Sequence, residues 1–332
     1  SFVTLLGVYS LSLFAIKAKN FINKSFFIFL SKEGAIFVNN IFMVIVCISV
    51  FFGTTYPLFV EIFSNNRISI GEPYFNSTVV PIMIPAIILM GAVPTLSWNK
   101  AINKDKIRKN STALLCTVFV ILILFLYFNN FSFTGFIGIF LSLWIIFNCF
   151  INIFIEIKKE VQNKLFSIKV FFKKFNSMTI AHLGVGLLIL GITGSSVWQK
   201  ENILRMKVND KTIINNYSIT FDAINEISGP NYYAIKAKFL VTDKNNHTVT
   251  LLEPENRIYP VTNNRTTEVS IHTNLIRDLY VVLGEGNENL GWVVRIYYNP
   301  LVIWIWIGAL IISLGGTLAL KNNLKLLKKD IK

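Results

Sequence analysis

The sequence has few of the residues from which soluble enzymes build catalytic or metal sites. Its 332 residues include three cysteines and three histidines, and none has the CxxC or Cys/His spacing of a zinc or thiol redox centre. A Walker phosphate loop, a GxSxG nucleophile turn and an HExxH helix are absent as well. The cysteines are Cys47, Cys116 and Cys149, and all three fall in apolar stretches. Any chemistry must therefore come from another class of site.

Charged residues are also scarce, at 15% of the chain, whereas 53% of the residues are hydrophobic and the mean hydropathy is +0.55. This balance excludes an ordinary soluble domain and indicates a membrane protein. A helix needs about 20 apolar residues to cross a hydrocarbon core of roughly 30 Å. Six stretches meet that length and a seventh, at the start, is cut short. The expected spans lie near residues 1–16, 35–53, 79–96, 112–128, 133–155, 178–198 and 300–320. The chain begins inside apolar sequence without Met, so we expect it to be the back part of something longer.

The net charge of +14 follows the order of the spans. The segments after the first, third, fifth and seventh spans carry 4, 5, 6 and 5 Lys or Arg, and the short loops after the second and fourth carry 1 and 0. This alternation is the positive-inside pattern, so a basic tail at 321–332 is expected to be cytoplasmic. A basic and aromatic stretch at 169–175 is expected to lie on the cytoplasmic leaflet as an amphipathic segment. The charge therefore predicts membrane lipid, not nucleic acid, as its partner.

Residues 199–299 form a polar insert between the last two spans. Apolar and polar side chains alternate from Tyr233 to Val241 and from Leu290 to Tyr298, which predicts half-buried strands. Other strand candidates are 213–221, 248–252, 257–261, 268–272 and 279–283. Short strands separated by turns predict a small closed or nearly closed β barrel. The expected fold is an all-α polytopic membrane bundle of about seven spans with one inserted β-barrel-like extracytoplasmic domain.

His182 is the only one of the three histidines in a predicted span. A polar ring in hydrocarbon loses its hydrogen bonds to water, so it is expected to face the bundle interior. One interpretation is an interhelical hydrogen bond. Another is that the neutral imidazole is an axial ligand of haem iron. The residues alone leave both interpretations open.

Small residues surround His182 on its helix. Gly186 shares its helical face and would leave a smooth surface beside the ring for a flat macrocycle. Gly191 and Gly194 instead favour close approach of a neighbouring helix. Trp304 and Trp306, near the outer end of the last span, are typical of an aromatic belt at the membrane surface.

Seven stretches of the chain form an ordered set. They are SKEGAIFVNN (31–40), GTTYPL (53–58), ISIGEPYFN (68–76), AHLGVG (181–186), GPNYYA (229–234), RDLYVVLGE (277–285) and WVVRIYYNPLVIWIWIGALIISLGG (292–316). In this order they resemble the C-terminal half of the CcmF family, the membrane subunit of the cytochrome c haem lyase. The resemblance covers essentially the whole chain.

The resemblance implies a role in attaching haem to the CxxCH motif of an apocytochrome c at the outer membrane face, with haem received from a haem chaperone. It also implies a permanent haem b held between two transmembrane histidines, with quinol as a potential electron donor. His182, in AHLGVG, falls on one of these ligands. The second ligand and the haem-handling segment belong to the family's N-terminal half, which is absent here. This chain alone is therefore expected to bind haem weakly and to be inactive, and no catalytic residue is assigned.

The resemblance further implies the bacterial inner membrane, with a periplasmic β domain and other maturation subunits as partners. The mitochondrial inner membrane is the alternative, because some mitochondrial members are naturally divided. Another class of function is a non-catalytic membrane scaffold or a transporter, with His182 making an interhelical hydrogen bond. A transporter is disfavoured by the lack of an internal repeat and by the few charges within the spans.

Overall fold

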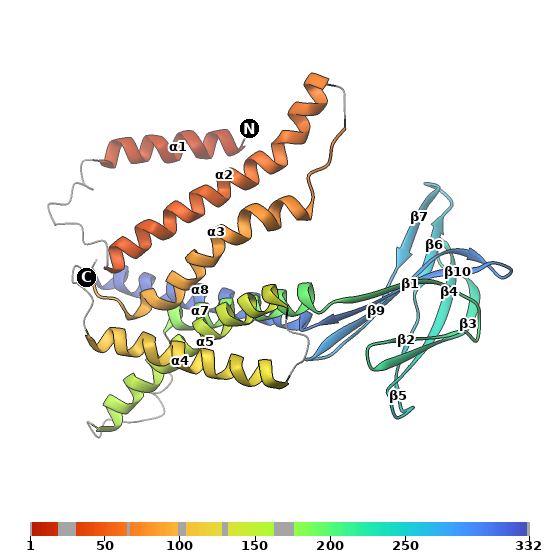
Figure 1. The fold of residues 1–332 in the computed structure, drawn as a ribbon. Helices are drawn as coiled ribbons and strands as arrows, with labels where there is room; N and C mark the ends of the chain where they lie inside the picture. Colours follow the sequence, from red (N-terminus) through yellow and green to blue (C-terminus); the bar gives the residue numbers. More distant parts are fainter. Residues whose placement is uncertain are drawn as a thin grey trace.

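The computed structural model describes residues 2–18, 31–64, 67–98, 104–127, 132–162 and 176–330. Within these residues the chain forms a helical bundle with a β-sandwich projecting from one end (Figure 1). The stretch 169–175, expected to be amphipathic, lies outside the described residues.

Six helices in the described part of the chain are long and apolar enough to cross a membrane. They are α2 (Lys32–Ser64), α3 (Glu72–Ala92, continued by the 3-10 turn η2, Val93–Thr95), α4 (Lys104–Tyr127), α5 (Phe133–Gln162), α7 (Ser177–Val197) and α8 (Val302–Asp330). The polytopic helical fold is thereby confirmed. Helix α1 (Phe2–Lys17) has 16 residues and is about 24 Å long, shorter than a hydrocarbon core of roughly 30 Å.

Helices α7 and α8 pack against each other through glycines spaced seven residues apart on both helices. Gly184 and Gly191 lie on α7, and Gly308 and Gly315 lie on α8. A Cβ atom on Gly308 would lie 2.7 Å from the backbone oxygen of Gly184, and one on Gly315 would lie 2.7 Å from the backbone nitrogen of Ala181. Because these positions carry no side chain, the two backbones meet directly along most of their length.

The opposite side of α7 packs on α5, which in turn packs on α3. The Ser142 hydroxyl of α5 donates a hydrogen bond to the backbone oxygen of Gly186 at 2.8 Å. The indole nitrogen of Trp144 donates to the backbone oxygen of Ile88 in α3 at 2.9 Å, and the ring fills the space beside Gly91. Two polar contacts to backbone oxygens thus fix α5 between α3 and α7.

The inserted domain consists of two antiparallel sheets. One has the strand order β1-β10-β9-β8, and the other has the order β2-β3-β4-β6-β7 with β5 paired to β4. The strands are β1 (Lys200–Met206), β2 (Lys211–Ile214), β3 (Tyr217–Ser228), β4 (Tyr233–Thr242), β5 (Thr248–Leu252), β6 (Glu255–Tyr259), β7 (Asn264–Glu268), β8 (Ser270–Thr273), β9 (Arg277–Asn287) and β10 (Gly291–Pro300). The β-barrel-like insert is therefore present, as two curled sheets that share one core.

The alternating side chains of both sheets meet in that core. Phe221 of β3 and Phe239 of β4 stack with their ring centroids 4.6 Å apart, and both are fully buried. Leu279 and Val281 of β9 and Val294 of β10 close the core from the other sheet. Strand β1 follows α7 and β10 leads into α8, so the α7–α8 pair carries the sandwich (Figure 1).

The two ends of the bundle differ in charge. The start of α2 is joined to the segment after η2 by a hydrogen bond from the Lys32 backbone nitrogen to the Ser97 oxygen, and Lys32 also lies over the Trp98 ring. Figure 1 places this junction and the C-terminus at the end of the bundle away from the sandwich. Lys104 and Lys106 at the start of α4 lie at the same junction, where Lys106 bonds to Ser97, so this end carries basic residues as the alternation of charge predicts.

A buried cation lies in the sandwich at the start of β9, next to the bundle. Arg277 is only 1% exposed. Its Nη1 donates to Nδ1 of His272 at 2.8 Å and to the His272 backbone oxygen at 3.0 Å, and its guanidinium lies 4.4 Å from the centroid of the Tyr217 ring. Burial lowers the pKa of His272, and the nearby Arg277 charge lowers that pKa further. Burial raises the pKa of Asp278 on the same strand.

Gly315 and Gly316 provide a matched test of the α7–α8 packing. We predict that Gly315→Ala destabilises the protein by about 1–3 kcal/mol, because its Cβ would meet the Ala181 backbone. Gly316→Ala, with no atom within 4 Å of its Cβ, should be neutral or stabilising by up to about 1 kcal/mol. The measurement is the thermal unfolding midpoint of each variant in detergent micelles. Equal midpoints for the two variants would contradict the packing.

The lowered pKa of His272 predicts the direction in which the stability of the fold changes with pH. Because the folded state resists protonation of His272, the unfolded chain binds the proton first as the pH falls below about 6.5, and stability should fall with it. His272→Gln keeps an acceptor for Arg277 but does not titrate, so its thermal midpoint should fall less between about pH 7.5 and about pH 5.5. The raised pKa of Asp278 acts in the opposite direction in both proteins. Identical losses would show that His272 is not the group responsible.

Candidate functional site

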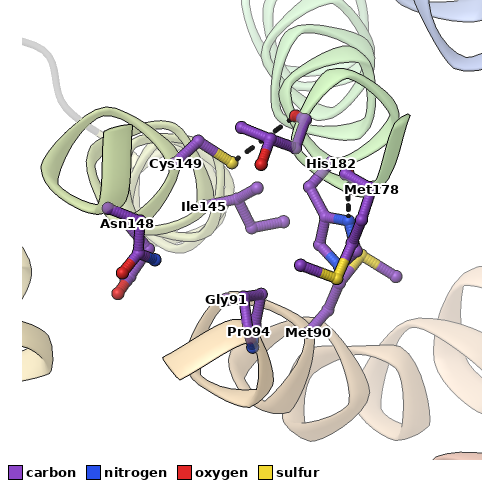
Figure 2. Close-up of a pocket in the computed structure, with 10 residues that line it drawn as sticks. Met90, Gly91, Pro94, Ile145, Asn148, Cys149, Met178 and His182 are labelled. Atoms are coloured by element: carbon purple, nitrogen blue, oxygen red, sulfur yellow. Dashed lines mark hydrogen bonds between the residues drawn. The ribbon is translucent and has the colours of Figure 1, made fainter. Parts of the chain in front are cut away.

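His182 is positioned by the start of helix α7. The side-chain oxygen of Asn176 accepts a hydrogen bond from the backbone nitrogen of Thr179 at 2.8 Å, which caps the helix. His182 follows in the second helical turn, on the side of α7 that faces α3 and α5 (Figure 2). Its position along the helix is thus fixed by a cap six residues earlier.

The imidazole of His182 is oriented by its own helix. Nδ1 lies 2.8 Å from the backbone oxygen of Met178, four residues earlier (Figure 2). Because a carbonyl oxygen can only accept, Nδ1 must carry the proton in this contact, and Nε2 of the neutral ring then keeps its lone pair. No hydrogen bond to Nε2 occurs among the described residues. This is the tautomer that a metal-binding histidine needs.

A small gap lies beside the ring. Its lining comes from three helices: Met90, Gly91 and Pro94 at the end of α3 and η2, Ile145, Asn148, Cys149 and Asn152 on α5, and Met178, Thr179 and His182 on α7. The gap measures about 10 Å³, which is close to the space of a single water molecule. Figure 2 shows the Met90 and Met178 side chains next to the imidazole. These flexible thioethers are the groups that fill the site most adaptably.

Two of the polar residues near the ring, Asn148 and Cys149, contact backbone oxygens. Asn148 is buried and donates from Nδ2 to the Trp144 oxygen at 2.9 Å. The Cys149 thiol lies 3.8 Å from the Thr179 oxygen. Across the described ranges, no cluster of three or more His, Cys, Asp or Glu could hold a metal ion. A metal at this site would depend on His182 and on ligands from elsewhere.

The site fits one bond to haem iron but does not enclose a porphyrin. Nε2 of His182 is a suitable donor, because its lone pair is free of hydrogen bonds among the described residues. The neighbouring gap of about 10 Å³ is far too small for a macrocycle. A haem bound to His182 would therefore need movement of Met90 and Met178 and a second wall supplied from outside these helices.

Gly186 does not provide the expected flat surface. A Cβ atom on Gly186 would lie 2.7 Å from Cγ1 of Ile146, so α5 already occupies the space next to it. That expectation was wrong, because the face that His182 and Gly186 share is a packing surface for α5. The expectation for Gly191 and Gly194 is confirmed, since Gly191 contacts Ile305 of α8 and Gly194 contacts Leu301 directly before α8.

The remaining histidines lie in the sandwich. His247 is in the turn between β4 and β5 with its side chain 79% exposed, and His272 is held by Arg277. Neither lies near His182 along the chain or in the fold. The sequence did not single out Met90 or Asn148, which join the site from other helices. The contact with Met178 could have been expected from the sequence, because the backbone oxygen four residues before a helical side chain lies beside that side chain.

The known proteins most relevant to this chain are cytochrome c-type biogenesis proteins. Residues 197–300 match the family described as "CcmF C-terminal beta-sandwich". The chain is 30% identical over 310 residues to CcmF of Pseudomonas aeruginosa, covering 93% of this chain and 47% of that protein. It is 32% identical over 295 residues to CcmF of Escherichia coli, covering 87% and 44%.

A solved structure shares the fold. The chain matches the structure titled "Cytochrome c Heme Lyase CcmF" with a TM-score of 0.68 and 21% identity, over 88% of this chain and 46% of that one. The chain thus spans about half the length of the relatives that it matches. From the sandwich match, the identities and the shared fold together, the chain is a member of the CcmF family of cytochrome c-type biogenesis proteins and corresponds to its C-terminal half.

Proposed function

We propose that this chain is the C-terminal part of a cytochrome c haem lyase, assists the covalent attachment of haem to apocytochrome c, and supplies one axial ligand of a membrane haem b through Nε2 of His182. The observation that carries the proposal is the contact between Nδ1 and the Met178 oxygen at 2.8 Å. It fixes the tautomer with a free Nε2 lone pair on a ring placed inside a membrane bundle.

The residues around the ring have separate tasks in this proposal. The Met178 carbonyl holds the imidazole and makes Nε2 a better donor. Trp144 holds α3 against α5. A bound haem b would supply one-electron redox chemistry. The chain's own contribution in this proposal is thus one oriented ligand and part of the wall around it.

The second ligand and the rest of the haem pocket come from protein outside this chain in the proposal. This agrees with the gap of about 10 Å³ beside His182, which leaves no room for a macrocycle among the described residues. It also agrees with the extent of the chain, about half of its relatives. The chain alone is therefore proposed to be inactive.

The sandwich is proposed to lie in the periplasm of a bacterium, above the inner membrane. The support is the concentration of basic residues at the opposite end of the bundle, which is the cytoplasmic end by the positive-inside rule. There the sandwich would help to form the surface where haem chaperone, apocytochrome c and other maturation subunits meet. Quinol is proposed as an electron donor, and the mitochondrial inner membrane is the alternative location.

A second candidate function is a membrane scaffold that assembles the same complex without touching haem. The small gap beside His182 favours this candidate. The interhelical hydrogen bond expected of His182 was wrong for the described residues, because Nδ1 bonds to the Met178 oxygen of its own helix. Here the imidazole would be a packed polar side chain and no more. The two candidates differ in what the loss of His182 does to bound haem.

We predict that His182→Ala abolishes the haem b absorption of the complex formed by this chain with the complementary N-terminal part of the family. The reduced optical spectrum of the purified complex is the measurement. The loss follows because one axial bond to the iron disappears. This chain purified by itself should bind little haem, with or without the substitution.

His247→Ala is the matched control, because its side chain is largely exposed in a sandwich turn. The control should retain the full haem signal. Co-purification of the two parts shows whether each variant still assembles. A His182→Ala complex that assembles and keeps an unchanged haem spectrum would refute ligation and leave the scaffold function.

A further inference from the structure

The turn between β8 and β9 presents two large aliphatic side chains at its tip. Leu275 is 63% exposed and Ile276 is 67% exposed. The tip carries no charged side chain, since the only charged residue of the turn, Arg277, is buried. Adjacent exposed aliphatic residues are unfavourable in water, where burying one fully is worth about 1.5–3 kcal/mol.

The turn is held rigidly by hydrogen bonds. Its base is closed by the Asn274 side-chain oxygen, which accepts from the backbone nitrogens of Ile276 at 2.9 Å and of Arg277 at 2.8 Å. The Asn274 backbone nitrogen donates to the Arg277 oxygen at 3.0 Å. From inside the sandwich, the Arg277 guanidinium donates to His272. The exposed tip is therefore a fixed feature and not a loose loop.

The tip lies level with the first turn of the last membrane span. The indole nitrogen of Trp304 donates to the Leu275 oxygen at 2.8 Å, and the Leu301 backbone nitrogen donates to the Ile276 oxygen at 2.9 Å. Leu301 has a left-handed backbone, with φ of 60°, where β10 ends and α8 starts. Both carbonyls of the tip are thus bonded to the head of a transmembrane helix.

The same level carries exposed tryptophan. Trp306 is 65% exposed at the head of α8, close in sequence to Trp304. Tryptophan at the end of a span lies at the boundary between headgroups and acyl chains. Because the Leu275 and Ile276 backbones are bonded to the head of α8, their side chains reach the same boundary. An aliphatic side chain is favoured there, and the polar backbone beside it can stay hydrated or hydrogen-bonded. This position singles out lipid as the partner of the tip.

We propose that the turn Asn274–Arg277 is a membrane anchor of the sandwich: Leu275 and Ile276 insert into the interfacial layer of the bilayer on the sandwich side. The hydrogen bonds from Leu301 and Trp304 already hold the turn at the head of α8, beside the chain connections at β1 and β10. Insertion of Leu275 and Ile276 into lipid reinforces this attachment and helps to set the angle at which the sandwich stands over the bilayer.

Depth measurement by nitroxide labelling tests the anchor. Leu275→Cys and Ile276→Cys are labelled in a chain whose native cysteines are replaced by alanine, assembled with its complementary part and reconstituted in phosphatidylcholine bilayers. Leu290→Cys is the matched control, because Leu290 is 66% exposed on the hairpin between β9 and β10. We expect collisions with oxygen to exceed collisions with a water-soluble nickel chelate at 275 and 276, and the reverse at 290.

The possible results separate lipid from the other occupants. Nickel collisions at 275 and 276 as frequent as at 290 would place the tip in water and overturn the proposal. Protection from both reagents would mean that protein covers the tip, which overturns it equally. Crosslinking from p-benzoylphenylalanine at position 275 serves as a second measurement with the native cysteines kept. Phospholipid adducts support the anchor, whereas peptide adducts or none contradict it.

Discussion

The direct contact between the backbones of α7 and α8 is the constraint on which the rest of this structure depends. Gly184 and Gly308 meet near the middle of the pair, and Gly315 meets Ala181 one residue before His182. Apolar side chains gain little by leaving lipid for one another, so close van der Waals contact between backbones has to hold the helices together. Glycine at seven-residue spacing on both helices makes that contact possible.

This contact fixes two parts of the molecule, the position of His182 and the attachment of the sandwich. On the bundle side, α7 is fixed between α8 and α5, so His182 faces α3 with its Nδ1 bonded to Met178. On the sandwich side, β1 leaves α7 and β10 enters α8, so the paired helices set the spacing of the two chain connections. His182 and the sandwich are thereby connected through the same pair of packed helices.

Much of the fold could be predicted from the sequence. The thickness of the membrane sets the length of an apolar span, and a strand with one buried face must alternate apolar and polar side chains. The six long spans and strands such as β4 and β5 appear near their expected places. Two strands hidden in the stretch 213–221 were missed, because Asn215 adopts a positive φ of 52° and turns the chain between β2 and β3. Asparagine tolerates this conformation, so the pair Asn215–Asn216 was the available signal. The role of Gly186 was misjudged because a glycine's neighbour depends on which helix packs there, and spacing within one helix does not reveal it.

The free Nε2 of His182 is the central claim, and a map of the chain assembled with its complementary part, obtained by electron cryomicroscopy in lipid, tests it most directly. The account predicts density joining Nε2 to a haem iron while Nδ1 remains at the Met178 oxygen. It also predicts that the second axial ligand lies outside this chain. An iron bound elsewhere, with Nε2 hydrogen-bonded to a neighbouring side chain, would contradict it.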